Sequence, residues 1–209
     1  MKKTLLSLAL LATAATAANA QATFGVKAGV VAATVSGDDT DGVDNRFGGQ
    51  FGLTANFGVN DMFSFQPELL YSQKGFQLKD EDSGLKLENK TTLHYIDVPL
   101  MLRLNADGPF FEAGPQVGFL VGRKSETEIS GGGNSGSTSE TDTDGFSKVD
   151  IGYIAGLGYQ LESGLSVGIR YNGGINSIFK DDNSSTGGDS KNVRNSAFQI
   201  QVGYRFGGK

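Results

Sequence analysis

The sequence has no cysteine and only four prolines among its 209 residues. Without thiols, disulfide bonds, Cys-ligated metals, thiol catalysis and a lipid on an N-terminal cysteine are excluded. Beyond residues 4–18 no apolar run approaches the ~20 residues that a membrane-spanning helix needs. Acidic residues outnumber basic ones, 23 to 18, so a nucleic-acid partner, which needs a clustered basic surface, is not expected.

The first 20 residues have the features of a secretory signal peptide. A start with two lysines precedes residues 4–18, which are rich in Leu and Ala, and small residues follow up to Ala20. We expect cleavage between Ala20 and Gln21, with residues 21–209 as the single mature domain; an uncleaved anchor is the alternative. Without its two leading lysines, the chain carries 16 basic and 23 acidic residues, a net charge of −7.

Apolar and polar residues alternate through most of the mature chain. Within residues 46–59, for example, Phe, Leu, Ala and Val alternate with Arg, Gln, Thr, Asn and Gly. A period of two predicts strands with one apolar face. Eight segments show the pattern: residues 23–35, 46–59, 62–76, 96–105, 111–122, 149–160, 165–172 and 198–206.

The connections between these segments alternate between short and long. The short ones are residues 60–61, 105–108 and 162–164, and the long polar ones are residues 36–45, 77–90, 124–145 and 180–195. This pattern with an even strand number predicts an all-β fold, an eight-stranded antiparallel transmembrane up-and-down barrel of the outer membrane. Three short turns and both termini would be periplasmic, and four long loops extracellular. Residues 130–139, rich in Gly and Ser, are expected to be mobile.

The apolar face carries aromatic residues at both ends, which predicts two girdles at the lipid–water boundaries. The periplasmic girdle would consist of Phe24, Phe57, Phe63, Phe111, Tyr159, Tyr204 and Phe206. The extracellular girdle would consist of Phe47, Tyr71, Phe119, Tyr171 and Phe198. The expected partners are therefore outer-membrane lipids and lipopolysaccharide, around a monomeric barrel. A soluble β-sandwich is the structural alternative, but its strands are usually shorter, about 5–6 residues.

The opposite face must then fill a lumen that is just wide enough for side chains. Small glycines there leave room for charged residues. By parity, nine charged side chains point inward: Lys27, Glu68, Lys74, Asp97, Arg103, Glu112, Asp150, Arg170 and Arg205. Because isolated buried charges are costly, they should pair, which predicts a charge-plugged lumen. A small gated pore lined by the same residues is the alternative.

Six short motifs resemble the PorT-like outer-membrane β-barrel family of Bacteroidota-type bacteria, a porin-type family. They are FGVKAG at 24–29, FQPELLYSQKG at 65–75, YIDVPL at 95–100, AGP at 113–115, GLGY at 156–159 and GYRF at 203–206. The resemblance covers essentially the whole mature chain, in order. It implies the same fold and compartment, and one branch of the family belongs to a protein-secretion apparatus. One departure is that residues 207–209 follow Phe206, where such chains commonly end on an aromatic residue.

Two further groups of residues are candidate chemical sites. His94 is the only histidine, and parity puts it on the lipid face near the extracellular end of its strand. Acyl transfer there would need a nucleophile beside it, and no G-x-S-x-G motif exists. Acidic residues crowd two loops, but they do not follow an EF-hand spacing. These are Asp38, Asp39, Asp41, Asp44, Asp142 and Asp144.

The sequence therefore favours a non-enzymatic barrel with a structural or interaction role, without cofactor or metal. The alternatives are a component of a protein-secretion apparatus, a lipid-modifying outer-membrane enzyme that uses His94, and a small gated pore. Other envelope proteins are candidate partners of an interaction barrel or of a secretion-apparatus component.

Overall fold

The computed structural model describes residues 22–37, 43–82, 85–131, 134–179 and 192–207. The proposed signal peptide and three of the loop aspartates (Asp38, Asp39 and Asp41) lie outside them. The described part of the chain contains no helix that is long and apolar enough to cross a membrane.

The described residues form nine antiparallel strands. They are β1 (Ala22–Gly37), β2 (Val43–Gly58), β3 (Phe63–Asp82), β4 (Leu85–Asn105), β5 (Pro109–Gly131), β6 (Asn134–Glu140), β7 (Val149–Gln160), β8 (Leu165–Gly174) and β9 (Val193–Arg205).

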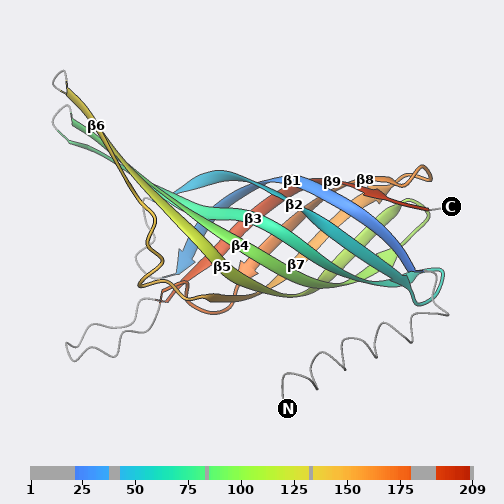
Figure 1. Cartoon of the computed structure of the whole chain (residues 1–209). Coiled ribbons are helices and arrows are strands. Elements are labelled where there is room, and N and C mark those ends of the chain that lie inside the picture. Colours follow the sequence, from blue (N-terminus) through green and yellow to red (C-terminus); the bar gives the residue numbers. More distant parts are fainter. Residues whose placement is uncertain (1–21, 38–42, 83–84, 132–133, 180–191, 208–209) are drawn as a thin grey trace, which may run out of the picture.

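Eight of these strands close into a ring (Figure 1). Strands β1 to β4 pair in sequence order, β4 pairs with β5, β5 with β7, and β7, β8 and β9 follow until β9 pairs with β1. The expected eight-stranded antiparallel barrel is thus confirmed. The ninth strand, β6, pairs with the outer part of β5 and lies outside the ring.

The structure corrects two of the expected loops. Residues 77–90 and 124–145 were expected to be irregular, but pairing of β3 with β4 continues to Asp82 and Leu85, and β5 continues to Gly131 against β6. The strands β3, β4 and β5 have 20, 21 and 23 residues, whereas crossing a bilayer takes about 9–11. Their outer halves therefore project beyond the barrel with β6, as Figure 1 shows at upper left.

Two of the three short connections are tight turns with positive φ angles. Between β4 and β5, Asp107 has a φ of 50° and Gly108 a φ of 119°. Positive φ is accessible to Gly and, at lower frequency, to Asp, so the Asp-Gly pair suits a hairpin turn. The turn between β7 and β8 ends on Gly164, with a φ of 91°. The pairing of β2 with β3, β4 with β5 and β7 with β8 places all three short turns at one end of the barrel.

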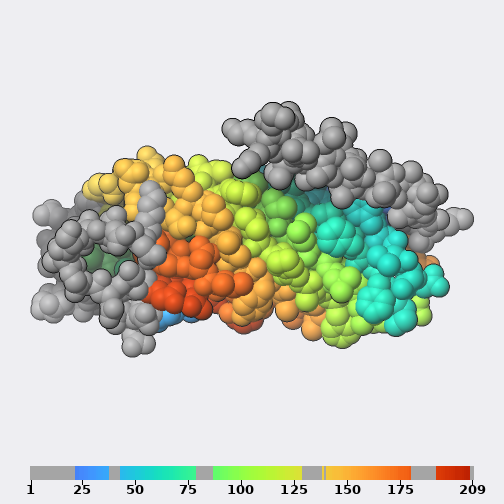
Figure 2. Space-filling model, turned by 90° about the horizontal axis from the view of Figure 1, so that it is seen from below, coloured from blue at the N-terminus to red at the C-terminus, as the bar shows by residue number. Residues whose placement is uncertain are grey.

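Glycines on the inner face make room for the charged side chains. A Cβ at Gly156 would lie 2.7 Å from Cγ of Arg170, and one at Gly118 would lie 2.5 Å from Oδ1 of Asp97. On the outer face, a Cβ at Gly49 would meet nothing within 4 Å. Figure 2 shows that outer surface as oblique bands of side chains from successive strands.

We predict that Gly156→Ala lowers the free energy of unfolding by about 1–3 kcal/mol, since the added methyl group would overpack the lumen against Arg170. Urea unfolding of the detergent-folded barrel, followed by circular dichroism, measures this. The matched control, Gly49→Ala, should change stability little. Equal effects of the two substitutions would show that the inner glycines have no space-making role.

Candidate functional site in the barrel interior

All nine charged residues expected on the inner face point into the barrel. Eight of them are buried, and none of these eight is more than 8% exposed. Arg205, at the short-turn end, is half-buried. Strand geometry directs these side chains into the lumen, because residues at every second position of a strand face the same side.

One cluster is centred on Arg170 of β8, which reaches across the lumen to two strands. Its Nη1 and Nη2 donate to Oε2 and Oε1 of Glu68, each at 2.7 Å, and its Nε donates to Oε1 of Glu112 at 2.5 Å. Lys27 of β1 also donates to Glu68 Oε1, at 2.7 Å. Such a two-pronged Arg–carboxylate pair is among the stronger charge-assisted arrangements.

Amide side chains that were not singled out from the sequence complete this cluster. Gln66 Nε2 donates to Glu68 Oε1 at 2.7 Å, and Gln201 Nε2 donates to Glu112 Oε1 at 3.2 Å. The signal that could have found them is parity, because both lie on the same face of their strands as the charges. They satisfy carboxylate lone pairs that burial would otherwise leave unpaired.

A second cluster lies nearer the long-loop end, around Lys74. Its Nζ lies 3.2 Å from Oδ1 of Asp97 and 3.2 Å from Oδ2 of Asp150, and 4.8 Å from the centre of the Tyr95 ring. Asn195 Nδ2 donates to Asp150 Oδ2 at 2.9 Å. This cluster holds one cation between two carboxylates.

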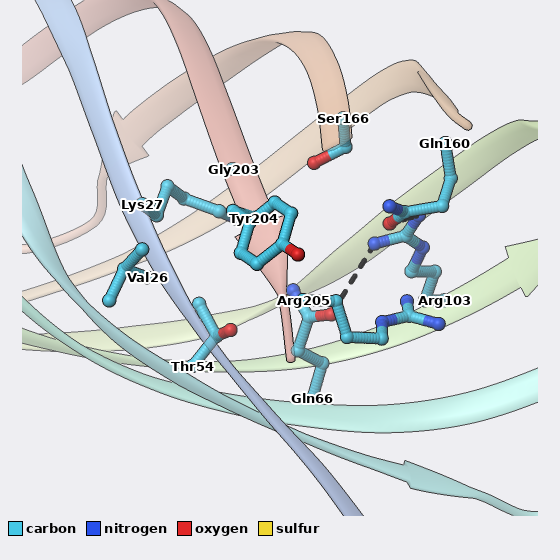
Figure 3. A pocket seen from close by; sticks show the side chains of 10 residues that line it. All are labelled: Val26, Lys27, Thr54, Gln66, Arg103, Gln160, Ser166, Gly203, Tyr204 and Arg205. Carbon is cyan, nitrogen blue, oxygen red and sulfur yellow. Dashed lines mark hydrogen bonds between the residues drawn. The ribbon is translucent and has the colours of Figure 1, made fainter. Parts of the chain in front are cut away.

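The remaining two arginines are not brought to a carboxylate among the residues that the structure describes. Arg103 donates to three neutral side-chain oxygens, of Asn105, Gln66 and Gln160, at 3.0, 3.4 and 3.2 Å. Its guanidinium carbon also lies 3.5 Å from the centre of the Phe110 ring. Arg205 lies beside it at the short-turn end (Figure 3). The expectation that all nine charges pair therefore fails at this end.

An apolar cluster closes the long-loop end of the lumen. It consists of Val35, Leu93, Tyr95, Phe146, Ile178 and Val193, all buried. Phe146 packs on Phe179 with ring centres 5.0 Å apart, and the two residues form a β-bridge. The sequence prediction did not include this cluster, although Phe146 is an isolated apolar residue in a polar stretch and residues 175–179 contain three apolar residues within a long connection.

On the outer wall, nine of the twelve girdle aromatics are exposed, and Phe57, Tyr71 and Tyr171 are half-buried. The register places members of the proposed periplasmic girdle beside the short turns, since Phe63 and Phe111 both pair with Leu104. Nearer the other rim, Tyr171 packs on Phe198 with ring centres 5.1 Å apart.

The other candidate sites gain few partners. The imidazole Nδ1 of His94 shares a 2.6 Å hydrogen bond with the Tyr71 hydroxyl, and no serine or carboxylate among the described residues bonds to that ring. Asp142 Oδ1 accepts a bond from the backbone N–H of Asp144 at 2.9 Å. The part of the chain that is described holds no group of three His, Cys, Asp or Glu placed to bind a metal.

Residues 16–180 match the family model described as "Outer membrane protein beta-barrel domain". The chain belongs to this family. It is an outer-membrane β-barrel protein, whose surroundings are lipid. No curated protein matches the sequence.

Solved structures show similarity at low identity. Ail, the attachment invasion locus protein of Yersinia pestis, is 16% identical with a TM-score of 0.42, covering 88% of this chain and 98% of that one. Neisserial surface protein A is 17% identical with a TM-score of 0.42, covering 88% and 99%. The N-terminal β-barrel domain of Pseudomonas aeruginosa OprF is 14% identical with a TM-score of 0.32, covering 89% and 100%.

Glu68→Gln is expected to lower the free energy of unfolding by about 3–5 kcal/mol, because it leaves the buried Lys27 and Arg170 without their shared carboxylate. Heat-modifiable migration and urea unfolding in detergent measure the loss. The control is Glu128→Gln, which breaks an exposed pair with Lys90 at 3.7 Å and should cost less than about 1 kcal/mol. A Glu68→Gln barrel as stable as the Glu128→Gln barrel would contradict a structural role for the cluster.

Proposed function

We propose that this protein is a non-enzymatic, non-conducting barrel that anchors a projecting β-sheet on the outer side of the membrane for interaction with another polypeptide. The observation that carries the first half of this proposal is that the lumen is filled at three levels. From the short-turn end these are the Arg170 cluster, the Lys74 cluster and the apolar cluster around Phe146.

The three levels argue against a gated pore. A pore needs a continuous wet path, whereas the Arg170 side chain spans the lumen between Glu68 and Glu112. Opening this level would separate a buried cation from two carboxylates, which is strongly unfavourable. The cavity at the short-turn end has a volume of only about 20 Å³, about enough for one water molecule.

The projecting sheet supports the interaction role. Outside the span of the membrane, β3, β4, β5 and β6 continue as four paired strands. Among the described strands, β6 pairs with β5 alone, so its other edge offers unpaired backbone N–H and C=O groups. An exposed sheet edge of this kind can add an extended segment of another polypeptide as a further strand.

A secretion-apparatus component is a second candidate, which the resemblance of residues 65–75 to the PorT-like family permits because one branch of that family has this role. In that case the polypeptide on the sheet would be another envelope protein in a stable complex. The lipid-modifying alternative has weaker support, since His94 has a tyrosine hydroxyl as its hydrogen-bond partner and acyl chemistry needs a nucleophile with an oriented base.

Purified barrel in a planar lipid bilayer should give no stable, porin-sized conductance, because side chains fill the lumen at three levels. A large general porin in the same bilayer serves as the positive control for insertion and recording. Stable conductance steps of porin size from this protein, proportional to the amount inserted, would contradict the filled lumen.

Replacement of residues 126–139 by an Asn-Gly turn should abolish any crosslinked complex formed through the sheet, while the barrel remains in the outer membrane and heat-modifiable. The matched control replaces residues 80–87 in the same way, which shortens the β3–β4 hairpin but leaves β6 in place. If the β6 edge is the binding element, the control variant should still form the complex. Photo-crosslinking in intact cells compares the two. Loss of the complex in the control alone, or in neither variant, would refute the β6 edge as the binding element.

A further inference from the structure

Charge is divided unevenly along the lumen. One half of the lumen extends from the Arg170 cluster to the short turns. It holds four cations and two carboxylates, a net charge of +2: Lys27, Arg103, Arg170, Arg205, Glu68 and Glu112. The Lys74 cluster holds one cation and two carboxylates, a net charge of −1. The nine inward side chains nearly balance in total charge, with five cations and four carboxylates, but the positive excess is concentrated at the short-turn end.

The excess positive charge is located on Arg103 and Arg205. Every hydrogen bond that Arg103 makes goes to a neutral oxygen, and Nη2 of Arg205 is buried with no hydrogen-bond partner among the described residues. Both guanidinium groups line the same small pocket, as Figure 3 shows. Two neighbouring, partly desolvated guanidinium groups without an anion are electrostatically unfavourable.

We propose that this pocket binds a small carboxylate between Arg103 and Arg205. Guanidinium groups present planar forks of N–H donors that match the two oxygens of a carboxylate. The hydroxyl of Ser166 lines the same pocket and offers one more donor. Gly203 keeps that hydroxyl accessible, since a Cβ there would lie 2.8 Å from Ser166 Oγ.

Size and access restrict the ligand. The pocket volume of about 20 Å³ excludes a bulky anion but admits one oxygen atom of a carboxylate, which is about the size of a water molecule. Gln160, Ser166 and Arg205 are half-buried, so the pocket is reached from the short-turn end. In outer-membrane barrels this end faces the periplasm. The carboxylate can therefore be a free small acid or a carboxylate group on a longer periplasmic molecule.

Acetate is the probe for the shared chemistry. With the mature, detergent-folded barrel, sodium acetate should give a saturable rise in the unfolding temperature that sodium chloride at the same ionic strength does not reproduce. Arg205→Gln should weaken the apparent affinity at least about tenfold, since it removes a charge-assisted hydrogen-bond donor. Arg194→Gln is the matched control on the same strand, and it should retain the acetate effect.

A second measurement uses the unaltered barrel, so it does not require that a variant folds. The ¹³C line of labelled acetate should broaden in the presence of unaltered barrel, and excess unlabelled acetate should reverse the broadening. A short peptide with a free C-terminal carboxylate, compared with its C-terminal amide, then separates a free acid from a carboxylate on a longer chain. Absence of saturable broadening, or an equal acetate response in the Arg205→Gln and Arg194→Gln barrels, would overturn the proposal.

Discussion

The pairing of β4 with β5 completes a ring in which every strand of the barrel has a hydrogen-bonded neighbour on both sides. In lipid this pairing is obligatory, because an unpaired backbone group in the hydrocarbon region costs several kcal/mol, about the value of the hydrogen bond it lacks. Closure with eight strands has a geometric consequence. It leaves an interior that only side chains fill, and the remaining features of the lumen follow from that narrow space.

Within this space, each of the eight buried charged side chains makes at least one hydrogen bond, although single atoms such as Glu112 Oε2 have no partner among the described residues. Arg170 is buried and contacts Glu68 and Glu112, with Gln66 and Gln201 occupying further carboxylate lone pairs. A ring of eight strands without glycine on its inner face would have no volume for these long side chains. The high glycine content and the buried ion pairs are therefore two parts of the same packing solution, and apolar side chains close the end where the polar residues stop.

The sheet that projects beyond the barrel differs from the barrel in its residue composition. Its strands are rich in Thr, Ser, Glu and Lys. Backbone pairing that begins in the membrane continues outward, because each added residue pair extends an existing ladder. The fold thus joins a lipid-facing barrel, with apolar residues outside, to a polar sheet that is suited to contact other molecules.

The sequence by itself determined the eight-stranded ring, its short turns and the inward direction of the nine charges, because period-two alternation follows directly from strand geometry. It did not reveal the projecting strands, because residues 79–90 and 124–140 are mostly polar and show no sustained alternation of apolar and polar residues. Strict alternation from Phe111 would put Gly122 on the inner face, whereas a bulge at Val121 pairs Gly122 with the outward-facing His94. A bulge depends on pairing between strands, which local sequence does not encode.

Only the tertiary structure decided which charges meet. Parity assigns Arg170 and Arg205 to the same face, but the level of each along the barrel depends on the register between strands. That register brings Arg170 to Glu68 and Glu112, and it leaves Arg103 and Arg205 among neutral oxygens. Sequence alternation therefore determines the face on which a side chain lies, whereas its partners across the lumen are determined by strand stagger in the closed ring.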